Sequence, residues 1–410
     1  MTQLVLTFAG PDAPGITARL MRILAAQKAR LDDVEQVVVQ GWLTLGFAVS
    51  LDSAGGTGAD GASAAGASGS HGAAAEEAML KELLFVSREL GLTMEYRRAP
   101  QASAAALRYA LTVIARSLGP AELQAVSEVL AQHGANIERI HRLSERGLAC
   151  VEFAVSLADE RSEAALKHAL LAAAGEGAFD CALQKESLLR RSKRLVVMDM
   201  DSTLIRIEVI DELARAHGVG EQVSGITRRA MMGELDYDQS LRERVALLKG
   251  LDAQVLQNLA DNLPLTEGAE TLLRVLKRLG YRTAVISGGF SVAAEALKKR
   301  LGIDFAWSNT LEIADGRLTG NVLGPIVNAQ RKAELLQELS VREGVPLDQV
   351  IAIGDGANDL LMLQKAGHGI AFHAKPKLRE AAHTAISAMG LDAILYLLGI
   401  SGREVAQLSD

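Results

Sequence analysis

Two aspartates directly follow a short apolar run near the middle of the chain. The run 195–198 reads as a buried strand, and Asp199 and Asp201 come straight after it. Side chains two residues apart in an extended segment point the same way, so both carboxylates can face one pocket. Like charges held that close repel unless a cation or a shared proton compensates. The pair therefore indicates a metal site or a nucleophile with an acid/base partner, although alone it could be a turn or a helix N-cap.

Polar residues also follow two later strand-like runs. The segment 287–289 (Ser-Gly-Gly) comes after 281–286, and the segment 354–359 (Gly-Asp-Gly-Ala-Asn-Asp) comes after 350–353. Between these two segments, Lys332 lies just inside a predicted helix. Ligands of open parallel sheets bind beyond the carboxyl ends of the strands, so we expect all these groups to converge.

These residue types suit phosphoryl transfer when they are taken together. Acidic oxygens without soft ligands suit Mg²⁺, and a hydroxyl beside glycine amides suits phosphate oxygens. A lysine supplies positive charge against both carboxylate and phosphate. A carboxylate would attack phosphorus, a metal would neutralise charge, and a neighbouring acid would protonate the leaving oxygen. Each element alone has a plainer explanation, but their joint occurrence at strand ends and a helix start favours a site.

The composition predicts a soluble globular protein of several domains. A length of 410 residues favours two or three domains, and 49% hydrophobic residues supply ample core. The net charge of −7 argues against a nucleic-acid partner. Cys150 and Cys181 form no disulfide framework, which favours a reducing compartment. No secretory signal and no membrane-spanning run is visible, so we expect a cytoplasmic protein without a membrane partner.

The first half of the chain contains the same order of elements twice. Residues 4–97 read as β-α-β-β-α-β, and so do residues 109–184. This duplication predicts two ferredoxin-like α+β domains, which we place at 1–100 and 105–186. The segment 53–75 is almost entirely Gly, Ala, Ser and Asp. Such a segment cannot bury enough apolar surface to offset its ordering entropy, so we expect a flexible loop inserted in the first domain.

The second half, 192–402, predicts a different fold class. Its strand-like runs alternate with long helical segments, which is typical of an α/β fold with a doubly wound parallel sheet. The mostly helical insertion at about 208–267 is too long for a crossover between two strands. We therefore expect it to form a helical cap over the pocket.

Four segments of this second half resemble the motifs of the haloacid dehalogenase superfamily, namely 199–203, 287–289, Lys332 and 354–359. Three further features resemble the phosphoserine phosphatase family within it, namely Glu208 and the segments 228–233 and 240–245. The resemblance covers essentially all of 194–400. It implies a Mg²⁺-dependent phosphatase with the superfamily's doubly wound sheet.

The resemblance implies a role for each matching residue of the sheet. Asp199 is expected to attack the phosphate and form an aspartyl-phosphate, and Asp201 to protonate the leaving group and then activate water. Mg²⁺ would be held by the Asp199 carboxylate, the Asp201 backbone carbonyl and Asp355. The remaining matches are expected to hold phosphate oxygens, offset charge or support the metal site: Ser287, Gly288, Lys332, Asn358 and Asp359.

Substrate recognition is implied for the cap. Glu208 would meet the substrate ammonium and Arg244 its carboxylate, while Met231 and Tyr237 would close an apolar lid. O-phospho-L-serine carries both an ammonium and a carboxylate, and a guanidinium can hold the latter with two hydrogen bonds. Taken alone, Glu208 and Arg244 read as ordinary solvated helix charges. Tyr237 stands where the family often has Phe.

The two N-terminal domains resemble ACT domains, which commonly bind amino acids at subunit interfaces. The segment 10–16 matches the ligand loop, where Asp12, Gly15 and the amides of a helix N-terminus would hold a carboxylate. The matching segment of the second domain, 116–121, lacks the Asp and the second Gly, which leaves dimerisation as its alternative role. A Gly-Pro loop is also a plain helix start. We expect L-serine as the regulatory ligand and a homodimer.

The resemblance thus implies an enzyme that hydrolyses O-phospho-L-serine to L-serine and phosphate, the last step of serine biosynthesis. Two alternatives stay open. One is a related small-molecule phosphatase or phosphotransferase, and the other is an amino-acid sensor with a vestigial catalytic domain. The intact set of Asp199, Asp201, Lys332 and Asp355 argues against the sensor.

Overall fold

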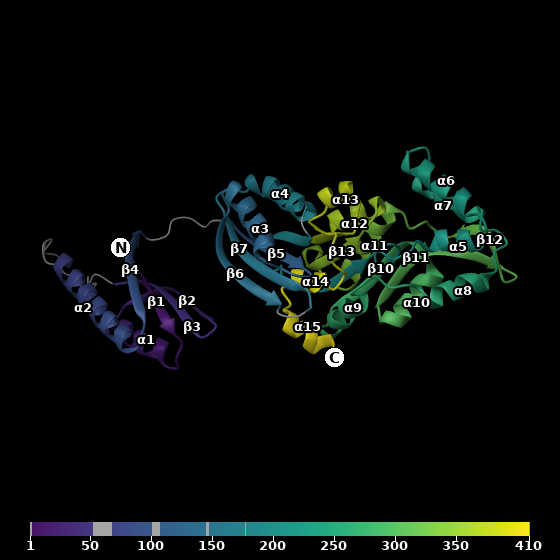
Figure 1. The fold of residues 1–410 in the computed structure, drawn as a ribbon. Coiled ribbons are helices and arrows are strands. Elements are labelled where there is room, and N and C mark those ends of the chain that lie inside the picture. The colour runs from purple at the N-terminus through teal and green to yellow at the C-terminus, as the bar shows by residue number, and fades with distance from the viewer. Residues whose placement is uncertain (1, 52–67, 101–106, 145–146, 177, 410) are drawn as a thin grey trace, which may run out of the picture. The chain divides into compact units, whose positions relative to one another are not determined.

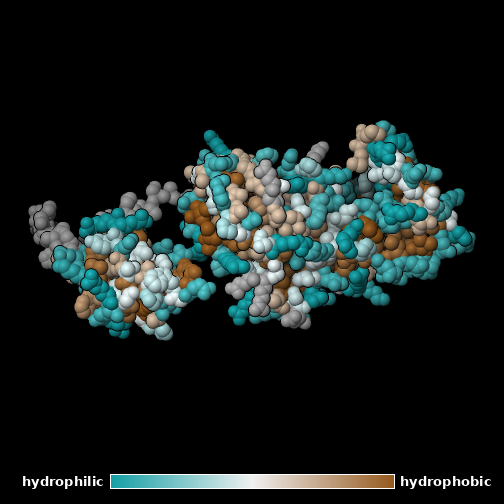
Figure 2. Space-filling view, viewed as in Figure 1, coloured by the Kyte–Doolittle hydropathy of each residue, from teal (hydrophilic) through white to brown (hydrophobic). Residues whose placement is uncertain are grey.

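The computed structural model describes residues 2–51, 68–100, 107–144, 147–176 and 178–409 (Figure 1). They belong to two compact units, 1–105 and 106–410, and each unit has its own hydrophobic core. The face shown in Figure 2 is mostly hydrophilic, with scattered hydrophobic patches. Among the described residues, no helix combines the length and the apolar character that crossing a membrane would require.

The first unit is an antiparallel sheet with the strand order β2-β3-β1-β4, packed against two helices. Leu4, Leu6 and Phe8 alternate along β1 and are buried against the helices, as the period of two in a strand requires. This is the predicted ferredoxin-like arrangement. Its elements are β1 (Thr2–Pro11), α1 (Ile16–Ala26), β2 (Arg30–Val39), β3 (Trp42–Ser50), α2 (Ser68–Glu89) and β4 (Thr93–Pro100).

The inserted loop of this unit is shorter than the sequence predicts. Helix α2 begins at Ser68, so the end of the expected loop 53–75 is helical. Three alanines at 73–75 favour the helix next to Glu76, because alanine has the highest helix propensity, whereas helix propensity does not explain the start at 68–72, which contains two glycines. Residues 52–67 lie outside the described residues.

A second ferredoxin-like domain opens the second unit, with the strand order β6-β7-β5-β8. It is joined to the rest of the unit by buried polar contacts. The Asp180 carboxylate accepts hydrogen bonds from the backbone N–H groups of 387–389 at 2.7, 2.9 and 3.0 Å. The elements of this domain are β5 (Leu107–Ala115), α3 (Pro120–Gln132), β6 (Asn136–Ser144), β7 (Ala149–Leu157), α4 (Ser162–Glu176) and β8 (Phe179–Lys185).

The centre of the second unit is a seven-stranded sheet with the order β12-β11-β10-β9-β13-β14-β15. All neighbouring strands are parallel except the β11–β12 pair, which confirms the predicted doubly wound sheet. The strands are β9 (Leu195–Met198), β10 (Arg282–Phe290), β11 (Phe305–Ala314), β12 (Arg317–Leu323), β13 (Val350–Gly354), β14 (His368–Phe372) and β15 (Thr384–Ile386).

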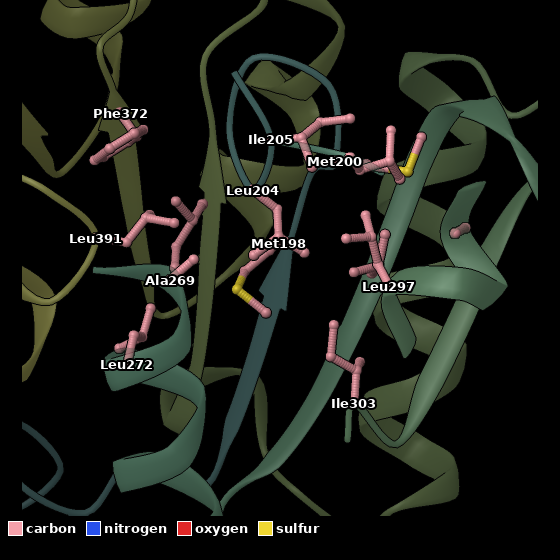
Figure 3. Close-up of a cluster of buried hydrophobic side chains, with 14 of the residues drawn as sticks. Met198, Met200, Leu204, Ile205, Ala269, Leu272, Leu297, Ile303, Phe372 and Leu391 are labelled. Carbon is pink, nitrogen blue, oxygen red and sulfur yellow. The ribbon is translucent and has the colours of Figure 1, made fainter. Parts of the chain in front are cut away.

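Helices cover the sheet, and both of its faces are apolar. Along β9, Val196 and Met198 enter one core cluster while Leu195 and Val197 enter another, so the strand is buried on both sides. Figure 3 shows Met198 within the first cluster. The helices that follow the cap are α9 (Ala269–Arg278), α10 (Ser291–Leu301), α11 (Ala329–Arg342), α12 (Leu360–Lys365), α13 (Pro376–Ala381), α14 (Ala393–Leu397) and α15 (Gly402–Ser409), with 3₁₀ turns η1 (Leu347–Gln349) and η2 (Ala357–Asp359).

Four helices between β9 and β10 form the cap: α5 (Val209–Ala216), α6 (Gly220–Met231), α7 (Tyr237–Ala246) and α8 (Ala253–Asp261). The chain leaves and re-enters the core side by side, since Arg206 N–H donates to Pro264 O and Thr266 N–H to Leu204 O, both at 3.0 Å. One further strand boundary differs from the prediction. Strand β10 runs on to Phe290, through the Ser-Gly-Gly segment, and its pairing with β11 shifts after Ile286.

Candidate active site

The carboxyl ends of three adjacent strands build the site. Strand β9 lies between β10 and β13, at the point where the chain order of the sheet reverses. Asp199 follows β9 directly, and its N–H donates to Ile353 O of β13 at 2.9 Å. Ser287 lies in β10, and Asp355 follows β13. The convergence that the strand ends predicted is therefore observed.

A buried ion pair lies at the centre of the site. Lys332 on α11 is 0% exposed, and its Nζ lies 2.7 Å from both Asp199 Oδ2 and Asp359 Oδ1. Burial alone would lower the pKa of the lysine, but the two carboxylates outweigh it and raise the pKa above its usual range. Lys332 is thus held protonated against both acids.

Three carboxylates face one another beside this lysine. Oxygens of Asp199, Asp355 and Asp359 all lie within 4.8 Å of one another. Burial and the Asp199 charge raise the pKa of Asp355 to about 7, although the Thr203 hydroxyl donates to its Oδ1 at 2.9 Å. One ammonium does not balance three carboxylates. The cluster could bind a metal ion, and its hard oxygen donors fit a divalent cation such as Mg²⁺.

Asp201 lies beside this cluster and faces the cap. Its Oδ1 accepts a hydrogen bond from Val209 N–H at the start of α5, at 3.1 Å. Burial and the nearby charges of Glu208 and Asp199 raise the pKa of Asp201 well above its usual value. A carboxyl group with a raised pKa can hold a proton and donate it, as a general acid requires.

The Ser-Gly-Gly segment approaches these acids closely. Ser287 is 0% exposed, and its Oγ accepts a hydrogen bond from Gly289 N–H at 2.9 Å. A Cβ atom on Gly289 would lie 2.3 Å from Asp201 Oδ2, so a side chain at this position would have to displace the Asp201 carboxyl group. Gly288 O accepts a hydrogen bond from Asn309 Nδ2 at 2.7 Å. The backbone and the hydroxyl of this segment can thus meet a phosphate group next to Asp199 and Asp201.

The cap contributes residues on three helices. Glu208 is the N-cap of α5 and accepts a hydrogen bond from Ser202 Oγ at 2.7 Å. Arg244 on α7 is partly buried and lies close enough to Glu208 to lower the pKa of that acid, which burial raises. Tyr237 begins α7, and burial raises the pKa of its hydroxyl to about 12. Met231, at the end of α6, is 67% exposed and does not contribute to a buried lid in this conformation.

Three supporting residues were missed by the sequence interpretation. Ser202 and Thr203 orient Glu208 and Asp355, and Ser202 does so from a left-handed backbone with φ of 55°. Both belong to the 199–203 segment, so their position in that motif was an available signal. Asn309 is 1% exposed and binds the backbone of Gly288 and Val327. Asn309 stands between Ser308 and Thr310 in β11, so the sequence does not single it out. Asn358, predicted to support the site, lies in η2 and is partly buried.

The loop of the first unit that resembles an ACT ligand loop lines a cavity of about 440 Å³. Asp12 and Gly15 both line it, together with Gln36 of β2. In the matching loop of the second domain, a carboxylate of the same chain already occupies a backbone amide. Gly119 N–H donates to the Glu122 carboxylate at 2.7 Å, which satisfies an amide that a ligand would need.

Comparison with known proteins agrees with this arrangement. Residues 193–367 match the haloacid dehalogenase-like hydrolase family, and residues 2–97 and 105–184 each match an ACT domain family. The phosphoserine phosphatase of Streptomyces coelicolor is 44% identical over 97% of this chain and 92% of that protein. Phosphoserine phosphatase SerB2 of Mycobacterium tuberculosis is 41% identical over 98% of this chain and 94% of that protein.

Solved structures show the same fold. A haloacid dehalogenase family hydrolase from Salmonella enterica serovar Typhi superposes with a TM-score of 0.64 and 33% identity, over 70% of this chain and 98% of that one. A probable phosphoserine phosphatase from Vibrio cholerae superposes with a TM-score of 0.56 and 36% identity, over 73% of this chain and 88% of that one. The similarity to the phosphatases of Streptomyces coelicolor and Mycobacterium tuberculosis extends over nearly the whole chain. The chain also has the two ACT domains and the parallel sheet with its acidic site. This chain is a phosphatase that belongs to the phosphoserine phosphatase family of haloacid dehalogenase-like hydrolases.

Proposed function

We propose that the chain hydrolyses O-phospho-L-serine to L-serine and phosphate through an aspartyl-phosphate on Asp199. The observation that carries the proposal is the buried pair of Asp199 and Lys332, 2.7 Å apart, beside two further carboxylates and the Ser-Gly-Gly segment. Relatives that carry the name phosphoserine phosphatase, similar over nearly the whole chain, support this substrate.

The reaction needs two proton transfers at one acid. A carboxylate oxygen of Asp199 attacks phosphorus, and the bond from phosphorus to the serine oxygen breaks. Asp201 gives its proton to that leaving oxygen, for which its raised pKa prepares it. Asp201 then takes a proton from water while the water oxygen attacks phosphorus, which breaks the bond to Asp199 and releases phosphate. Lys332 and the 287–289 segment hold the phosphate oxygens throughout.

Mg²⁺ is the proposed metal, held by the Asp199 carboxylate, the Asp201 backbone carbonyl and Asp355. When bound, it supplies positive charge for the phosphate oxygens in the transition state. The chain's own residues fit this ion, because the acidic cluster offers hard oxygens and carries more negative charge than Lys332 offsets. Thr203 holds Asp355 in place through its 2.9 Å hydrogen bond.

Substrate selection is proposed for the two cap charges. Glu208 would bind the ammonium of phosphoserine, and Arg244 would bind its carboxylate with two hydrogen bonds. Ser202 supports this assignment for Glu208, since its hydroxyl donates a hydrogen bond to the acid and holds it next to the 199–203 segment. Met231 and Tyr237 would close over the apolar part of the substrate.

Hydrolysis of phosphoserine would be the last step of serine biosynthesis, carried out in the cytoplasm. L-serine would bind at the first ACT-like loop, where Asp12 and Gly15 line a cavity. A homodimer is supported by apolar side chains exposed along one edge of the first unit, among them Val34, Val37 and Val39.

Substrate analogues test the selection directly. Phosphoethanolamine lacks the carboxylate and 3-phospholactate lacks the ammonium. We expect kcat/KM for phosphoserine to exceed both by at least about tenfold. Arg244→Lys should turn over phosphoserine and phosphoethanolamine with similar kcat/KM. Glu208→Gln should turn over phosphoserine and 3-phospholactate with similar kcat/KM. Arg242→Lys, on the exposed face of the same helix, is the matched control and should keep the preference for phosphoserine over both analogues. Equal turnover of all three esters by the wild-type chain would overturn the substrate assignment.

A further inference from the structure

The cap touches the core at two polar points where α7 begins. Asn328 Nδ2 donates to Asp238 Oδ1 at 3.0 Å, and the Tyr237 hydroxyl donates to Gly288 O over a longer distance of 3.4 Å. Tyr237 and Asp238 are the first two residues of α7. The start of one cap helix is therefore fastened both to the segment 287–289, which we propose binds phosphate and call the phosphate-binding segment, and to the start of α11.

The Asn328 side chain makes two hydrogen bonds, one within α11 and one to the cap. Its Oδ1 accepts a hydrogen bond from Arg331 N–H at 3.0 Å and so caps α11, the helix that carries Lys332 one turn later. Its amide nitrogen is left to meet the cap through Asp238. One side chain therefore joins the start of α7 to the N-terminus of α11.

Asn309 closes these contacts into a ring inside the core. It donates to Gly288 O at 2.7 Å and accepts from Val327 N–H at 2.8 Å, next to Asn328. The two points that hold the cap are thus joined to each other by hydrogen bonds of Asn309. Gly288 also fits against the cap closely, because a Cβ atom there would lie 2.0 Å from the Tyr237 hydroxyl.

We propose that Asp238 and Asn328 are positioning residues whose hydrogen bond, assisted by the Tyr237 hydroxyl, fastens the cap over the phosphate-binding segment and so sets the affinity for substrate. The inference rests on the proposed function for its substrate. Apparent affinity scales with the fraction of protein in the binding-competent conformation, so a cap that opens more often raises KM. The chemistry at Asp199 is untouched, and kcat is expected to stay within about twofold.

Exchanging the two side chains tests the bond itself. Asn328→Asp keeps the helix cap, because aspartate caps as well as asparagine, but places a carboxylate against Asp238. We expect KM for phosphoserine to rise about fivefold to tenfold, the size of one lost hydrogen bond. The double variant Asp238→Asn/Asn328→Asp exchanges donor and acceptor, and its KM should return to within about twofold of the wild type.

A charge-matched control separates the bond from simple repulsion of the substrate. Asp236→Asn/Asn328→Asp has the same net charge as Asp238→Asn/Asn328→Asp. Asparagine at 236 can still cap α7, but this variant places no new hydrogen-bond donor against position 328. Its KM should remain high. Tyr237→Phe removes the longer contact, and Gly288 O keeps its bond to Asn309, so a smaller rise in KM is expected.

Hydrogen exchange on the ligand-free protein gives a readout without substrate. Amides of 232–240 should exchange faster in Asn328→Asp and in the charge-matched control, and at the wild-type rate in the exchanged pair. Rescue by the charge-matched control, or exchange rates that do not differ among the variants, would overturn the proposal. If the wild-type chain does not act on phosphoserine, the proposed function fails, and these exchange rates still decide whether the cap is fastened here.

Discussion

Lys332 Nζ lies 2.7 Å from Asp199 Oδ2, in an ion pair that is almost completely buried. A buried charge is tolerated when it is paired, and here a single ammonium serves two carboxylates. The raised pKa of Lys332 keeps it protonated across the physiological range. Asp199 is thereby held close to a permanent positive charge, at the end of a strand that is buried on both sides.

Removal of this lysine should harm both stability and activity. Lys332→Met leaves Asp199 and Asp359 buried without their partner. We expect the free energy of unfolding to fall by about 3–5 kcal/mol and phosphate release to fall at least about a hundredfold. Denaturant titration measures the first effect. Lys365→Met, at an exposed site on α12, is the control and should leave both unchanged. An equally stable Lys332→Met would show that the ion pair does not support the fold.

A methyl group on Gly289 should disable the acid without unfolding the protein. The added Cβ would lie 2.3 Å from Asp201 Oδ2, so Gly289→Ala must displace Asp201 or the phosphate-binding segment. We expect kcat to fall at least about a hundredfold, because a misplacement of about 1 Å has that effect. Gly225→Ala, in α6, has no atom within 4 Å of the new Cβ and should keep full activity. Full activity of Gly289→Ala would contradict the assigned geometry.

Metal binding should stabilise the protein through Asp355. Mg²⁺ at a hundred times its Kd is expected to add about 2.7 kcal/mol to the free energy of unfolding, and EDTA to remove this gain together with activity. Asp355→Asn should weaken Mg²⁺ binding at least about tenfold in a calorimetric titration. The control is Asp315→Asn in the β11–β12 turn, where φ is 50° and asparagine is tolerated. A Mg²⁺ affinity unchanged by Asp355→Asn would place the metal elsewhere.

Acid should loosen the contact between the second ACT domain and the sheet. His368 is buried, its Nε2 lies 3.0 Å from Gln184 Nε2 of β8, and burial lowers its pKa to about 3. The unfolded histidine binds a proton below pH 6.5 and the folded one only near pH 3, so the unfolded state binds more protons between these values. Stability should therefore fall as the pH drops through this window, by roughly 2–5 kcal/mol in total.

Substitution of that histidine checks the pH effect. His368→Gln should flatten the pH dependence of the free energy of unfolding between pH 6.5 and 3. His141→Gln, at an exposed position of β6, should leave the slope unchanged. The same slope in His368→Gln as in the wild type would assign the effect to other groups.

Much of the site could be predicted because strand ends in a doubly wound sheet converge. The convergence of Asp199, Ser287 and Asp355 could be predicted from the order of the apolar runs, together with the rule that ligands bind beyond the carboxyl ends of parallel strands. Asn309 and the Asp238–Asn328 bond could not be predicted, since each joins segments that are distant in sequence through contacts that leave no periodic pattern.

Boundaries were predicted less well than elements, for local reasons. Strand β10 continues through two glycines that read as a loop, because the parallel pairing with β11 resumes at Phe290. Helix α2 begins before its first apolar turn, and the alanines at 73–75 favour part of this extension. The close contact of the second ACT domain with the sheet rests on Asp180 and the backbone of 387–389, which no local pattern reports.

The most direct test of the central claim is phosphate release from O-phospho-L-serine with Mg²⁺, measured for the wild type and for Asp199→Asn. Asp261→Asn, exposed on α8, is the matched control. We predict rapid release by the wild type and the control, and a loss of at least about a thousandfold in Asp199→Asn with its melting temperature retained. Release at the wild-type rate by Asp199→Asn, or none by a folded, metal-loaded wild type, would contradict the account.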